Sequence, residues 1–170
     1  MKKFVNRKQE IAFLEKEYQC NTSSLVILYG RRRVGKTALI TEFIKNKKAV
    51  YFLATEENET QNRIDFKNII AEQINNVLLK NANIDNWDII FKIWLQSDTE
   101  KKILVIDEFQ YIGKSNRAFP SIFQKIWDTM LKDSNVMVIL CGSLISMMES
   151  QTLAYTRRYT FTKKGKIIDK

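Results

Sequence analysis

The sequence is 170 residues long, which is enough for one globular domain that needs no disulfide or metal to fold. It contains no histidine and only two cysteines, Cys20 and Cys141, which excludes histidine-based catalysis and argues against zinc or iron–sulfur sites. The net charge of +9 favours a polyanionic partner, either a nucleotide or a nucleic acid. No apolar stretch has the length of a membrane span or the pattern of a signal peptide, so we expect a cytoplasmic protein without a membrane partner.

Short apolar runs alternate with helical apolar stripes along the chain. In chain order they predict a strand over 25–29, a helix over 36–46, a strand over 50–53, a helical stripe between Arg63 and Lys80, a helix that Asp85 could cap, a strand over 103–106, a helix that opens with the capping box 121–124 after Pro120, and a strand over 136–141. Strands that are apolar throughout are covered on both faces, and strands that alternate with helices form parallel sheets. We therefore expect a three-layer α/β domain with a mostly parallel sheet.

Chemically distinctive residues follow three of the predicted strands. Gly30 follows the first, Asp107 follows the third, and Gly142 and Ser143 follow the fourth. Ligands of parallel α/β sheets bind at the carboxyl ends of the strands. The sequence therefore predicts that these residues meet at one edge of the sheet.

Residues 30–37 read Gly-Arg-Arg-Arg-Val-Gly-Lys-Thr and match the phosphate-loop pattern G-x-x-x-x-G-K-[ST] at every fixed position. At average residue usage a chance match arises at about 1 in 30,000 positions. The glycines let the backbone wrap around phosphate oxygens, while Lys36 supplies a positive charge and Thr37 a hydroxyl for Mg²⁺. Arg31–Arg33 either lie in solvent or add positive field near the triphosphate. The predicted nucleotide contacts in and after this loop are Gly30, Arg31, Arg32, Arg33, Val34, Gly35, Lys36, Thr37 and Ala38.

Two carboxylates, Asp107 and Glu108, follow the aliphatic strand 103–106. Asp107 could hold Mg²⁺ through water molecules, and Glu108 could take a proton from an attacking water. The strand 50–53 separates this acidic (Walker B) strand from the phosphate-loop strand in sequence, an arrangement typical of ATP-hydrolysing domains. No N-K-x-D-like element is present, so GTP is less favoured than ATP.

Four segments together resemble the archaeal ATPase family, a group of AAA+-like P-loop ATPases. They are 4–7, 29–37, 106–111 and 140–143, and the resemblance extends over about 4–155. It implies that Lys36, Glu108 and Ser143 are catalytic, that Thr37 and Asp107 bind Mg²⁺, and that Val5, Asn6 and Arg7 lie near the adenine. A plain strand-closing turn also accounts for Ser143, and Gln110 either senses the nucleotide state or serves local packing.

The sequence departs from the family pattern near its end. The family continues into a helical lid and a winged-helix region, whereas here a basic tail, 156–170, follows an ATPase core, 1–155. In this tail Arg157 or Arg158 could stabilise charge, and 159–162 and 167–168 are weak candidates for a fifth strand.

We expect a P-loop domain that binds ATP or ADP with Mg²⁺ and hydrolyses ATP weakly unless a protein partner or a second copy completes the site. The alternatives are a basic nucleic-acid-binding module with a vestigial phosphate loop, and a fragment that folds poorly.

Overall fold

The computed structural model describes residues 7–152, 159–161 and 167–169, and the structural statements below concern these ranges. The four apolar runs form strands close to the predicted bounds: β1 (Ser24–Tyr29), β2 (Ala49–Leu53), β3 (Lys102–Asp107) and β4 (Val136–Gly142). Every residue of β1, β3 and β4 is buried, which explains why their sequences do not alternate. Burial alternates along most of β2, as expected for a strand at the edge of the sheet.

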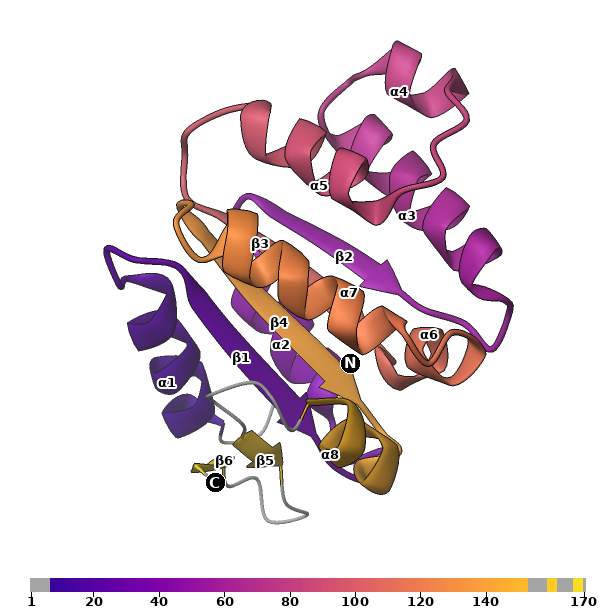
Figure 1. Ribbon diagram of the computed structural model, residues 1–170. Helices are drawn as coiled ribbons and strands as arrows, with labels where there is room; N and C mark the ends of the chain where they lie inside the picture. The colour runs from indigo at the N-terminus through magenta and orange to yellow at the C-terminus, as the bar shows by residue number, and fades with distance from the viewer. Residues whose placement is uncertain (1–6, 153–158, 162–166, 170) are drawn as a thin grey trace.

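The strands form one six-stranded sheet in the order β2-β3-β4-β1-β5-β6 (Figure 1). The pairings β2–β3, β3–β4 and β4–β1 are all parallel, so the predicted fold class is confirmed. β2 intervenes between β1 and β3 in sequence, but it is β4 that lies between them in the sheet. β5 (Tyr159–Phe161) pairs in parallel with β1, and β6 (Ile167–Asp169) pairs antiparallel with β5, so both weak candidates in the tail form strands.

Helices cover both faces of the sheet. α1 (Lys8–Tyr18) and α2 (Lys36–Ile44) pack on one face, where Leu14 and Leu39 meet strand residues such as Val26. α6 and α7 cross the opposite face, with α2 behind the sheet in Figure 1. The elements associated with this second face are α3 (Glu59–Gln73), α4 (Val77–Asn81), α5 (Trp87–Gln96), α6 (Gln110–Ser115), α7 (Phe119–Ile126), its π-helical extension (Trp127–Leu131) and α8 (Ile145–Thr152).

Three helical predictions differ from the structure in detail. The stripe between Arg63 and Lys80 is two helices, because the chain turns at Asn75 (φ 53°) between α3 and α4. Asn tolerates this left-handed conformation better than most residues. α5 has Asn86 rather than Asp85 as its N-cap residue. α7 begins at Phe119, ahead of the expected capping box, and places its proline in the first turn, where the missing N–H costs nothing.

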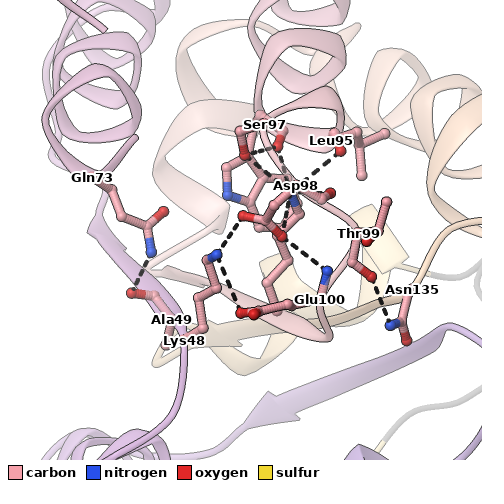
Figure 2. A network of polar contacts seen from close by, with 11 residues as sticks. Lys48, Ala49, Gln73, Leu95, Ser97, Asp98, Thr99, Glu100 and Asn135 are labelled. Carbon is pink, nitrogen blue, oxygen red and sulfur yellow. Dashed lines mark hydrogen bonds and ion pairs between the residues drawn. The ribbon is translucent and has the colours of Figure 1, made fainter. Parts of the chain in front are cut away.

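A buried lysine, Lys102, binds the end of α5 at the edge of the sheet opposite the predicted site. Lys102 is 3% exposed, and its Nζ donates to the Trp94 carbonyl at 2.5 Å and to Ser97 Oγ at 3.2 Å. The Trp94 carbonyl also accepts from the Ser97 N–H and Oγ, and Lys102 Nζ donates to the Leu95 carbonyl at 3.3 Å, so the ammonium adds to the capping of the last turn. Lys48 pairs with Asp98 beside this point, just after the C-cap residue Ser97 of α5 (Figure 2). Lys102 therefore joins α5 to β3.

We expect Lys102→Met to lower the free energy of unfolding by about 1–3 kcal/mol, because it removes the hydrogen bonds that a buried ammonium makes to the Trp94 and Leu95 carbonyls. This corresponds to a fall of roughly 2–10 °C in the thermal midpoint of a domain this size. Lys92→Met, at an exposed position of α5, is the matched control and should leave the midpoint unchanged. Equal midpoints for the two variants would contradict the capping role.

Candidate functional site

The phosphate loop connects β1 to α2 at the carboxyl edge of the sheet. Its first residue is tied to β4, because the Gly30 N–H donates to the Gly142 carbonyl at 3.3 Å. Gly35 ends the loop as the N-cap of α2 with φ 88°, a conformation that favours glycine. The first turn of α2 leaves N–H groups without intrahelical acceptors, which is the usual anion-binding feature of such a loop. Thr37 and Ala38 in this turn are exposed and accessible to a ligand.

Lys36 is buried within the loop. Its Nζ donates to the carbonyls of Gly30 at 2.6 Å and Arg31 at 2.8 Å. Burial lowers the pKa of Lys36, and the nearby Cys141, Glu108 and Asp107 act in the opposite direction. A cation in this position lies between the loop backbone and the acidic end of β3.

Asp107 links three elements through its carboxylate. Oδ1 accepts from the Glu108 N–H at 2.8 Å, and Oδ2 accepts from Thr37 Oγ1 at 3.2 Å. Oδ2 also accepts from the hydroxyl of Tyr51, and the pKa of Tyr51 is raised by burial and then by this bond. The Thr37 hydroxyl and the Asp107 carboxylate are therefore adjacent hard-oxygen donors, which fits Mg²⁺. Among the described residues no three His, Cys, Asp or Glu side chains group as a metal site.

Glu108 is held from two sides. Its Oε2 accepts from Ser143 Oγ at 2.8 Å and from Gln110 Nε2. Its backbone has φ 54°, a left-handed conformation that is uncommon for a residue with a Cβ. Gln110 is fully buried and approaches β4 closely, since a Cβ at Gly142 would lie 2.3 Å from Gln110 Oε1. The structure thus brings Ser143 and Gln110 to the same carboxylate oxygen.

The remaining predicted residues are Arg7, the three arginines of the loop, and residues outside the described ranges. The Arg7 guanidinium donates to the Val34 carbonyl, so Arg7 lies against the phosphate loop. Arg31, Arg32 and Arg33 are exposed. The predicted residues that lie outside the described ranges are Val5, Asn6, Arg157 and Arg158, together with the boundary at 155.

The sequence did not single out two tyrosines of this site. Tyr51 belongs to the predicted strand 50–53, and its hydroxyl donates to Asp107. Tyr111 is on α6, and its hydroxyl accepts from Arg32. Tyr51 reaches Asp107 because β2 pairs with β3 in a register that sets Leu53 beside Asp107. A tyrosine in the middle of an otherwise apolar run is the local signal for Tyr51, and it does not identify the partner.

We expect Gly35→Ala to lower the free energy of unfolding by about 1–2 kcal/mol, the cost of a left-handed residue with a Cβ. A Cβ at Gly35 would also lie 2.9 Å from Arg7 Nη2, but that atom ends a flexible side chain. The loss, measured by thermal unfolding, should therefore persist in an Arg7→Ala background. If it disappears there, the contact with Arg7 is the cause and not the backbone.

The parallel sheet and the loop between β1 and α2 define an α/β domain of the P-loop class. The chain belongs to the family described as an ATPase domain predominantly from Archaea, whose model matches residues 4–165.

Two relatives from Methanocaldococcus jannaschii show the extent of the likeness. One protein is 31% identical over 152 residues, which are 89% of this chain and 32% of that protein. A second, named as an ATP-binding protein, is 62% identical over 45 residues, which are 26% of this chain and 76% of that protein. The chain therefore spans about a third of the length of the first relative.

Solved structures of low sequence identity share the fold. The Walker-type ATPase PABY2304 of Pyrococcus abyssi matches with a TM-score of 0.65 and 19% identity, over 89% of this chain and 49% of that chain. The Orc1 protein of Aeropyrum pernix, solved in complex with DNA, matches with a TM-score of 0.62 and 15% identity, over 92% of this chain and 45% of that chain. In the part of the chain that the structure describes, no helix is long and apolar enough to cross a bilayer.

Proposed function

We propose that this domain binds ATP together with Mg²⁺ and hydrolyses the bond between the β- and γ-phosphates, with Glu108 as the general base. The observation that carries the proposal is the contact of Thr37 Oγ1 with Asp107 Oδ2 at 3.2 Å. This contact joins the phosphate loop to the acidic end of β3, beside Lys36 and Glu108. Membership of an ATPase-domain family supports ATP binding.

Lys36 and the loop backbone would hold the phosphates. The Lys36 ammonium donates to two loop carbonyls, and phosphate oxygens can replace these acceptors because they carry full negative charge. The loop N–H groups and the first turn of α2 would bind the remaining oxygens. A magnesium ion at Thr37 and Asp107 would neutralise charge on the β- and γ-phosphates.

Glu108 is suited to take a proton from water. Ser143 and Gln110 both donate to Oε2, and no donor among the described residues occupies Oε1. Oε1 is therefore available to accept a proton while Oε2 stays fixed. As the water oxygen bonds to the γ-phosphorus, its proton passes to Glu108 and the bond to the β-phosphate oxygen breaks, giving ADP and inorganic phosphate.

The proposal also gives roles to residues outside the phosphate loop and the end of β3. The first relative is about three times as long as the matched region. A protein partner or a second copy of the chain would complete the site. Arg7, Val5 and Asn6 would flank the adenine, and Arg157 or Arg158 would supply charge near the phosphates. These roles rest on the family resemblance, together with the position of Arg7 against the loop.

A second candidate function is nucleic-acid binding, supported by the net charge of +9. Such binding would weaken steeply with salt, because it releases counterions from the phosphates. Duplex DNA titrations at low and moderate salt, with and without ATP, measure this directly.

We expect ATP with Mg²⁺, at about 100 times its dissociation constant, to stabilise the folded chain by about 2.7 kcal/mol. The thermal midpoint would then rise by roughly 5–10 °C. Lys36→Ala should remove the rise, and Lys45→Ala, an exposed position at the end of α2, should keep it. A rise of equal size in the Lys36 variant would contradict the assigned phosphate contact.

Glu108→Gln should slow ATP turnover by about 10²–10⁴-fold while ATP affinity is retained, since the amide cannot take up the proton. Phosphate release measured under saturating ATP tests this, with binding measured separately. Glu57→Gln, at an exposed position after β2, is the control for loss of one carboxylate. Unchanged turnover in the Glu108 variant would exclude it as the base.

A further inference from the structure

Arg32 connects the phosphate loop to two other segments of the site. Its Nη2 donates to the Tyr111 hydroxyl at 2.5 Å, and its Nε donates to Ser143 Oγ at 3.4 Å. Tyr111 is on α6, and Ser143 follows β4. One exposed side chain after β1 therefore reaches the segments that follow β3 and β4.

The hydrogen bonds from Arg32 to Glu108 run in one direction only. A guanidinium carries donors and no acceptor, and an ionised carboxylate only accepts. Ser143 has one hydroxyl proton, which it gives to Glu108 Oε2 at 2.8 Å, so its lone pair is left to accept from Arg32. Neighbouring bonds in such a chain polarise and strengthen one another. Arg32 thus orients the hydroxyl that holds Glu108.

We propose that Arg32 is a positioning residue that sets the orientation of Glu108 by way of Ser143. This inference rests on the proposed role of Glu108 as the base. Lys36 Nζ donates to the carbonyl of Arg31, which belongs to the peptide group that joins Arg31 to Arg32. Transfer of Lys36 from this carbonyl to a phosphate changes the anchoring of Arg32. The position of the base is thereby linked to occupancy of the phosphate loop.

The geometry of Arg32, and not merely its charge, carries this role. Arg31 and Arg33 are equally exposed cations in the same loop, and neither side chain makes a hydrogen bond to a residue that the structure describes. Arg32 uses two different nitrogen atoms of its planar fork for Tyr111 and Ser143. A lysine ammonium is a compact point charge and cannot reproduce that fork.

The experiment measures kcat and KM for ATP in the full chain. Arg32→Ala should lower kcat by about 10-fold, as expected for losing a hydrogen bond from a charged group, with KM changed by less than about threefold. Arg32→Lys should resemble Arg32→Ala and not the unchanged chain. Arg117→Ala, an exposed arginine between α6 and α7, is the control and should keep both constants. The thermal midpoint of each variant confirms folding.

Double variants separate positioning from a direct contact with ATP. In a Ser143→Ala background, Arg32→Ala should cause no further loss of kcat, because its route to Glu108 is already broken. If the two losses multiply, or if Arg32→Ala raises KM alone, Arg32 acts on the phosphates and the inference is wrong. If Glu108→Gln does not slow turnover, or the chain binds ATP without hydrolysing it, the proposed function itself fails, and the inference fails with it.

Discussion

The pairing of β4 with both β1 and β3 is the constraint on which the candidate site depends. All three strands run parallel, so their carboxyl ends meet at one edge. The last residues of β4 bind the segments that follow both neighbouring strands. The Cys141 carbonyl accepts from the Phe109 N–H at 2.9 Å, and the Gly142 carbonyl accepts from the Gly30 N–H at 3.3 Å. The start of the phosphate loop and the segment after Asp107 are thus held to the same short stretch of backbone.

The buried charges of this edge are stabilised by one another and by backbone groups. Lys36, at the start of α2, and Asp107, at the end of β3, are both buried, and a buried charge is costly without a partner. Lys36 is bound by loop carbonyls, and Asp107 by Thr37, Tyr51 and a backbone N–H. The Cys141 thiol next to them is deeply buried, and burial raises its pKa, so it fills space as a neutral group.

Hydrogen bonds also make this edge a connected network. Arg32, Ser143 and Glu108 form a directed chain, and Gln110 reaches the same carboxylate from α6. The phosphate loop, the tip of β4 and the acidic residue after β3 are therefore joined by hydrogen bonds between side chains. At the opposite edge of the sheet, Lys102 donates to the Trp94 carbonyl and to Ser97 Oγ at the end of α5. These bonds hold α5 against the sheet.

Much of the fold was predictable from local patterns. The apolar runs of β1, β3 and β4 identify buried strands, and the spacing in residues 30–37 identifies the loop, because both depend on residues close in sequence. The break at Asn75, the start of α7 and the helices α1, α6 and α8 were not predicted. Tertiary packing decides where these elements begin and end.

The sequence by itself determined the class of the domain and singled out Lys36, Thr37, Asp107 and Glu108 as candidate site residues, since each belongs to a recognisable loop motif or follows a recognisable strand. Only the tertiary structure decided which of the remaining polar residues join them. Tyr51 meets Asp107 through the β2–β3 register, and Arg32 meets Ser143 and Tyr111 through the strand order. These partners are 56, 111 and 79 residues apart in sequence, and no local pattern specifies a contact that arises from the pairing of distant strands.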